Sequence, residues 1–133
     1  MIDKKNKSFH SACFACGKCN IQGLNMKFDN GQDGSTCYVS IPKKFQSYEG
    51  VVHGGIVATM LDAAMVHTLQ QKSGGNPLTC RLEVRYLRAV PSGEILTVNA
   101  RAIGKRGRVM LANAEIMCSN QCYARAHGAF TLQ

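Results

Sequence analysis

GVVHGGIVATMLDAAMVHTLQQ, residues 50–71, predicts one long helix around which the rest of the chain packs. The apolar run begins after His53 at two glycines and ends before SGGNP, residues 73–77, a stop rich in Gly and Pro. Apolar residues occur on almost every side of the run, which is typical of a buried helix. Polar residues interrupt it too often for a membrane span.

Asp62 is the only formally charged residue in this stretch. Burying a lone carboxylate is costly unless a partner compensates, so Asp62 is a candidate general base or nucleophile. Gly54 and Gly55 leave the backbone N–H groups of the helix N-terminus open to approach. Such groups can bind a carbonyl oxygen and stabilise the oxyanion that develops on it.

Gly54 and Asp62 are too far apart to act on one carbonyl from the same helix. Eight residues of helix separate them by about 12 Å along the axis. Two antiparallel copies of the helix would instead pair Gly54 of one chain with Asp62 of the other. If both groups are catalytic, the sequence predicts a homodimer with two equivalent sites.

Structural roles compete with these functional ones. A Gly-Gly pair before a helix is often only a tight turn. His53 is better explained as a helix cap or turn residue than as a catalyst, and His67 as a core or interface histidine. Met60 and Met65 are expected to pack in the core.

The chain has 133 residues, which suits a single domain, and a formal charge of +8. This charge fits nucleic acid, an anionic membrane surface or a phosphorylated small molecule. The basic residues are scattered, so neither nucleic acid nor membrane is the expected partner. Residues 1–12 are predicted to be a flexible segment before a domain at 13–133. They show no signal-peptide plan, which favours a cytoplasmic location and reduced cysteines.

His10, Cys13, Cys16 and Cys19 follow one another at intervals of three residues. Zinc usually takes two separated pairs of ligands, and no second pair follows at that spacing. Cys118 and Cys122 would contribute only if the fold brought them near. We therefore expect a compact turn packed on the domain, with no metal and no cofactor, and keep a metal site as the minor alternative.

Alternating apolar and polar residues predict strands on both sides of the helix. The expected strands are residues 25–30, 36–41, 78–87, 94–103, 109–117 and 122–132. A hairpin signal, Gly104-Lys105-Arg106-Gly107, joins two of them. This order predicts an α+β domain whose antiparallel sheet curves around the central helix.

Three segments together resemble one family: YEGVVHGGIVATMLDAAM (48–65), CFACGKCNIQGLNMKF (13–28) and LTCRLEVRYLRAVPSGE (78–94). They are similar to the hotdog-fold acyl-CoA thioesterases of the phenylacetate-pathway (PaaI-like) type. The resemblance implies about six strands around one helix, and dimers that often pair into tetramers. It also implies hydrolysis of an acyl-CoA thioester at the dimer interface.

Site roles carry over by position within this resemblance. The Gly54 amide, with Gly55 and His53 beside it, would polarise the thioester carbonyl, and Asp62 of the partner subunit would activate water or attack directly. Thr79 falls where the family often has a Ser or Thr that orients the water. Gln46 or its neighbour Ser47 matches a residue that contacts the substrate or water.

Four basic residues in or near loops suit the phosphates of CoA. They are Arg88, Lys105, Arg106 and Arg108. Ordinary solvated surface charges are an equally good explanation for any one of them. Two other functions remain open: a hotdog module that senses acyl-CoA without hydrolysing it, and a small metal-binding or redox protein. A hotdog dehydratase ranks below hydrolysis.

Overall fold

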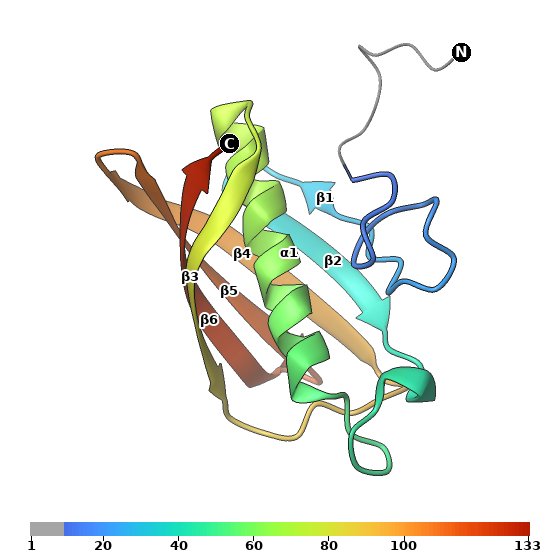
Figure 1. Ribbon diagram of the computed structural model, residues 1–133. Helices are drawn as coiled ribbons and strands as arrows, with labels where there is room; N and C mark the ends of the chain where they lie inside the picture. Colours follow the sequence, from blue (N-terminus) through green and yellow to red (C-terminus); the bar gives the residue numbers. More distant parts are fainter. Residues whose placement is uncertain (1–9) are drawn as a thin grey trace.

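The computed structural model describes residues 10–133 and consists of one long helix packed against a six-stranded sheet (Figure 1). The elements, in chain order, are β1 (Asp29–Asn30), β2 (Ser35–Ser40), the 3-10 helix η1 (Lys43–Phe45), α1 (Gly54–Ser73), β3 (Pro77–Tyr86), β4 (Ile95–Arg106), β5 (Val109–Cys118) and β6 (Gln121–Leu132). Residues 1–9, most of the predicted flexible segment, lie outside the described part.

The strands form one antiparallel sheet in the order β1-β2-β4-β5-β6-β3. Hairpins join β4 to β5 and β5 to β6, whereas β3 follows α1 and pairs with β6 at the opposite edge from β1. The sheet curves around α1 (Figure 1). The α+β hotdog fold expected from the sequence is confirmed.

Strand periodicity explains why the sheet accepts the helix. On β5, Met110, Ala112, Ala114 and Ile116 are buried on the face towards α1, and the residues between them are less buried. Small alanines at the centre of a sheet let a helix backbone approach closely. Met60 and Met65 of α1 are fully buried, which confirms the packing role predicted for them.

Both ends of α1 follow known capping rules. His53 is the N-cap residue, and its side chain accepts a hydrogen bond from the Gly55 N–H. Gly74 ends the helix at a φ of 71°, the left-handed conformation that glycine adopts most easily. The cap predicted for His53 is therefore confirmed.

The N-terminal strand and one hairpin differ from prediction. Only Asp29–Asn30 of the expected strand 25–30 is paired as a strand, and Asn25 has a φ of 56°. The strand β4 continues through Lys105 and Arg106, so the hairpin turn is Gly107-Arg108. The apparent turn signal at Gly104 instead marks a bulge, at which one extra residue enters the strand.

Among residues 10–133, no helix is both long and apolar enough to cross a membrane.

Candidate functional site

The N-terminus of α1 offers a free backbone donor. The Gly55 N–H bonds to His53 Nδ1 at 2.9 Å, and the N–H groups of Ile56 and Val57 bond to the His53 carbonyl. Within the described residues, no group accepts a hydrogen bond from the Gly54 N–H. Because His53 Nδ1 accepts this hydrogen bond, the neutral imidazole carries its proton on Nε2.

Glycine at position 54 is not required by the packing of this chain. A Cβ atom at Gly54 would lie 3.6 Å from Tyr86 Oη, an ordinary contact, and the residue has no positive φ. At Gly55, by contrast, a Cβ would lie 3.2 Å from His53 Nδ1 and crowd the cap. Packing within the chain therefore does not explain the glycine at position 54, whereas a ligand that approaches the amide would.

Asp62 lies two turns further along α1 and bonds to the edge strand β3. Thr79 Oγ1 donates a hydrogen bond of 2.7 Å to Asp62 Oδ1. Burial raises the pKa of the Asp62 carboxyl, and the Thr79 hydrogen bond opposes part of this rise. Neither of the two ion pairs within residues 10–133 includes Asp62. Its polar partner in this part of the chain is the Thr79 hydroxyl, which agrees with the lack of a charged residue near Asp62 in the sequence.

β3 runs along α1 and places one hydroxyl group beside Asp62 and another beside Gly54. Thr79 and Tyr86 pair with the inward-facing residues Phe130 and Ala124 of β6, so both face the helix. Thr79 reaches Asp62, whereas Tyr86 Oη donates a 2.7 Å hydrogen bond to the Gly54 carbonyl. Sequence reasoning missed Tyr86, although its inward place in the alternating strand was readable.

A hollow of about 440 Å³ lies beside the helix N-terminus. Ser47, Gly54 and Arg88, three of the residues predicted for the site, meet in its wall. The rest of the lining is mainly apolar and consists of Tyr48, Val51, Val52, Val57, Tyr86, Leu87, Ala89 and Val90. A small apolar hollow with a free amide at its edge is suited to an acyl group with a carbonyl at one end.

Gln46 has a local bond near this hollow. Its Oε1 accepts a hydrogen bond of 3.2 Å from the Gly50 N–H and so supports the loop before α1. Its amide NH₂ has no acceptor among the described residues and is available to donate. Ser47, the alternative candidate, is exposed, and its hydroxyl bonds to the Val51 carbonyl.

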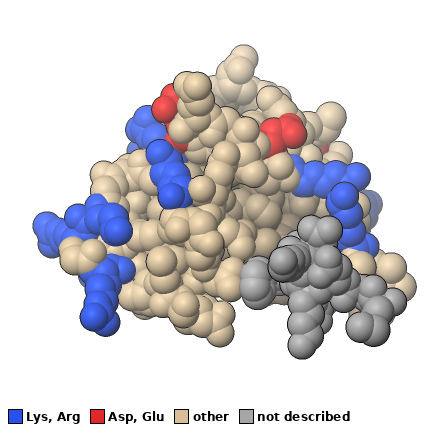
Figure 2. Space-filling model, turned by 90° about the horizontal axis from the view of Figure 1, so that it is seen from above, with Lys and Arg blue, Asp and Glu red and all other residues tan. Residues whose placement is uncertain are grey.

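The four basic residues predicted to bind phosphate do not form one cluster. Arg88 lies at the hollow, while Lys105, Arg106 and Arg108 lie at the β4–β5 hairpin, towards the other end of α1 (Figure 1). Figure 2 shows Lys and Arg in separate groups on the face viewed, one at the left where the hairpin extends. One chain alone therefore does not bring these four charges to a single ligand.

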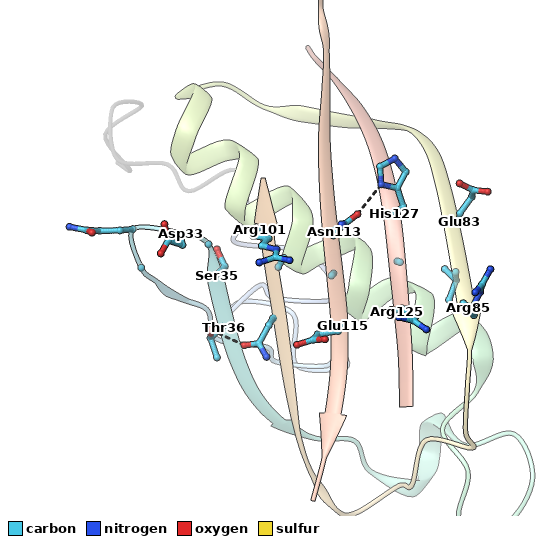
Figure 3. A pocket seen from close by; sticks show the side chains of 18 residues that line it. Asp33, Ser35, Thr36, Glu83, Arg85, Arg101, Asn113, Glu115, Arg125 and His127 are labelled. Carbon is cyan, nitrogen blue, oxygen red and sulfur yellow. Dashed lines mark hydrogen bonds between the residues drawn. The ribbon is translucent and has the colours of Figure 1, made fainter. Parts of the chain in front are cut away.

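A larger hollow of about 1,000 Å³ lies on the other face of the sheet, away from α1 (Figure 3). Its side chains come from neighbouring strands, and two of the cross-strand pairs are bonded: Thr36 to Asn99 at 3.0 Å and His127 to Asn113 at 2.8 Å. Glu115 and Arg125 sit opposite each other in the register. This polar surface contains none of the predicted site residues.

The cysteine-containing turn packs on the domain, as expected for a compact turn. Cys13 and Cys16 are half-buried against the core, whereas Cys19 is exposed. His67 of α1 is half-buried and its Nε2 lies 3.2 Å from Cys16 Sγ. Sequence spacing did not connect His67 with this turn, because the two segments are 51 residues apart in the chain.

The sequence of this chain matches a known family. A family description of the thioesterase superfamily matches residues 49–122, more than half of the chain, and covers the whole of α1 together with β3, β4 and β5. The chain belongs to the thioesterase superfamily.

Individual relatives agree with this assignment. Acyl-coenzyme A thioesterase THEM4 of Bos taurus is 26% identical over 104 residues, which are 77% of this chain and 42% of that protein. This chain thus spans about two-fifths of the length of the curated relative it matches.

Solved structures share the fold at lower identity. Zebra fish thioesterase superfamily member 2 has a TM-score of 0.78 and 16% identity, over 94% of this chain and 93% of the other. A hypothetical thioesterase of Streptococcus pneumoniae TIGR4, solved with coenzyme A, has a TM-score of 0.74 and 17% identity. That match covers 82% of this chain and 89% of the other.

Proposed function

We propose that this chain is an acyl-CoA thioesterase whose two active sites form between the subunits of a homodimer. The observation that carries the proposal is the free Gly54 amide at the edge of an apolar hollow, where the chain itself does not need a glycine. The name of the bovine relative and the coenzyme A bound by the streptococcal structure support acyl-CoA as the substrate class.

In this mechanism the thioester carbonyl oxygen accepts a hydrogen bond from the Gly54 N–H. The positive end of the α1 dipole adds to the stabilisation of the oxyanion. Asp62 of the partner subunit then either takes a proton from water as the hydroxyl adds to the carbonyl, or attacks the carbonyl itself. In the first route the proton passes to the departing CoA thiolate. In the second the carboxylate displaces the CoA thiolate to form an anhydride, and water then hydrolyses this anhydride to two carboxylates, with one proton going to the thiolate and one to solvent.

The exposed edge of the sheet supports the dimer. β3 has ten residues and pairs only with β6 among the described strands, so its other edge has free backbone groups. A long bare edge strand invites pairing with another strand. Two β3 strands meeting antiparallel across a two-fold axis would bring the two α1 helices side by side, which is the arrangement that Gly54 and Asp62 require.

The remaining predicted residues have supporting roles in this proposal. Thr79 orients the Asp62 carboxylate, and the Gln46 amide, or the Ser47 hydroxyl, contacts the substrate or water. Arg88 lies close enough to the hollow to meet the nucleotide part of CoA, while Lys105, Arg106 and Arg108 would come from the partner subunit. Exposed arginines and lysines suit phosphate oxygens without needing rigid geometry.

The test is hydrolysis of a panel of acyl-CoA esters with short, medium, long and aromatic acyl groups. Free CoA is followed by chromatography, because the seven thiols of the chain would react with a thiol reagent. Asp62→Asn is expected to lose activity, whereas the matched control Asp33→Asn, in an exposed loop, is expected to keep it. Binding of CoA without release from any ester would contradict hydrolysis and favour an acyl-CoA sensor.

Three finer points belong to the same proposal. We place the chain in the PaaI-like branch on the segments quoted above, expect the dimers to associate further into tetramers, and expect a cytoplasmic location. Light scattering across a range of protein concentrations measures both the formation of dimers and their association into tetramers.

A further inference from the structure

One cluster of ligand-type side chains lies outside the proposed active site. His10, Cys16 and His67 each offer one nitrogen or sulfur atom, and these three atoms lie within 4.8 Å of one another. His67 is five residues after Asp62 on α1, which turns it well away from the Asp62 side of the helix. Nothing in the proposed hydrolysis uses these three residues.

The His67 ring is held firmly in place. It stacks between His10, with ring centroids 4.4 Å apart, and Phe28, at 4.3 Å. Its Nε2 points at Cys16 Sγ over 3.2 Å. Tetrahedral zinc with ordinary bond lengths would separate a nitrogen and a sulfur ligand by about 3.5 Å, so a shift of a few tenths of an ångström would suffice.

Cys13 is the candidate for a fourth donor. It is half-buried and precedes Cys16 by three residues, the Cys-x-x-Cys spacing common at zinc sites. Its Sγ is not one of the three atoms that lie within 4.8 Å of one another, so its side chain would turn towards the ion on binding. Together the four residues offer two thiols and two imidazoles, a donor set that tetrahedral zinc prefers. The sequence spacing showed no ligand beyond the N-terminal turn, and His67 of α1 supplies one from outside it.

The turn that holds these residues depends on glycine. A Cβ atom at Gly17 would lie 2.5 Å from the Cys13 nitrogen and 2.6 Å from the His10 carbonyl oxygen, too close for any other residue. The Gly17 N–H bonds to the Cys13 carbonyl at 2.7 Å, and the Cys13 N–H to the His10 carbonyl at 3.0 Å. This compact backbone holds His10, Cys13 and Cys16 within one tight turn.

A further hydrogen bond holds the imidazole of His10. His10 Nε2 lies 2.6 Å from Gln70 Oε1, and the Gln70 amide in turn donates to Asn76 Oδ1 at 3.2 Å. Zinc bound through His10 Nδ1 would leave this oxygen partner on the second ring nitrogen, as is common for metal-binding histidines. Cys19, in contrast to the half-buried Cys13, is exposed.

We propose that His10, Cys13, Cys16 and His67 bind one Zn²⁺ ion, which fastens the N-terminal turn to α1. The ion is structural, because all four positions are filled by protein and none remains for water or substrate. Binding deprotonates both thiols and releases their protons to solvent, with no change of oxidation state.

The test uses the full chain without a histidine tag, stripped of metal under reducing conditions and then titrated with Co²⁺. Wild type is expected to bind one Co²⁺ per chain with the intense visible absorption of a tetrahedral site and a thiolate charge-transfer band. Zn²⁺ is expected to abolish both signals and to raise the thermal midpoint. No stoichiometric binding, or an octahedral cobalt spectrum, would overturn the proposal.

Variants separate this site from a surface thiol that binds metal by chance. Cys16→Ser is expected to lose the charge-transfer band or weaken binding by roughly tenfold or more, whereas Cys19→Ser keeps wild-type binding. His67→Asn is expected to weaken binding similarly. If the His67→Asn protein does not fold, His10→Asn takes its place in the test. Equal loss in Cys16→Ser and Cys19→Ser would contradict the assignment.

Discussion

Thr79 Oγ1 donates a 2.7 Å hydrogen bond to Asp62 Oδ1 and so ties the edge strand β3 to the middle of α1. The bond fixes one carboxylate oxygen, and the other has no hydrogen-bond partner among the described residues. Burial and this hydroxyl act on the carboxyl in opposite directions, since burial raises its pKa and the hydrogen bond lowers it. Position and proton affinity of the proposed base therefore both depend on Thr79.

Asp62→Asn is expected to lower turnover by roughly 10²–10⁴-fold, the usual contribution of a positioned base, and to stabilise the fold at neutral pH. Because the pKa of Asp62 is raised in the folded state, the ionised carboxylate opposes folding as pH rises through that pKa. Urea unfolding at pH 7 should show the gain. The gain should vanish at a pH low enough to protonate Asp62 in both states, and a variant less stable than wild type at pH 7 would contradict this.

Thr79→Ala is expected to raise the pKa of Asp62 further, because it removes the hydrogen bond that opposes the effect of burial. The acidic limb of the profile of kcat/KM against pH should then move to higher pH. Thr79→Ser keeps the hydroxyl and should leave the limb where it is. The same shift in both variants would mean that the hydroxyl is not responsible.

Gly54→Ala is expected to keep the fold while kcat falls by roughly 10–10³-fold, because the added methyl group has room in the chain but blocks the approach to the free amide. Gly55→Ala serves as the comparison for stability. Its methyl group meets the His53 ring at 3.2 Å and should lower the thermal midpoint. An active Gly54→Ala enzyme would remove Gly54 from the mechanism.

His53→Ala is expected to destabilise the protein by about 1 kcal/mol through loss of the N-cap on α1. His53→Asn can accept the same bond from the Gly55 N–H and should recover most of that stability. Chemical denaturation of the three proteins measures both effects. If Asn were as destabilising as Ala, the contribution of His53 would lie outside the cap.

Local patterns in the sequence were sufficient for most of the fold. The Gly-bounded apolar run predicted α1 within a few residues, and alternation in residues 78–87 predicted β3. The strand expected at 25–30 shrank to two residues, because Asn25 adopts a left-handed φ and the pairing with β2 begins only at Asp29. Short edge strands depend on such local geometry more than on periodicity.

Contacts between distant segments were beyond sequence reasoning. Asp62 stood out because an isolated acid in an apolar helix is unusual, and Gly54 because of its place before the helix. The contact of His67 with Cys16 and the bond of Tyr86 to the Gly54 carbonyl join residues 51 and 32 positions apart. No periodicity within either segment carries that information, since it arises only when α1 is placed on the sheet.

Subunit complementation tests the central claim most directly. Gly54→Ala and Asp62→Asn chains, each expected to have strongly reduced activity alone, are co-expressed with different tags, and the mixed dimer is isolated and assayed for CoA release. The account predicts that one of its two sites is intact, so the mixed dimer should have roughly half the wild-type activity. A verified mixed dimer with no activity would contradict a site shared between Gly54 of one subunit and Asp62 of the other.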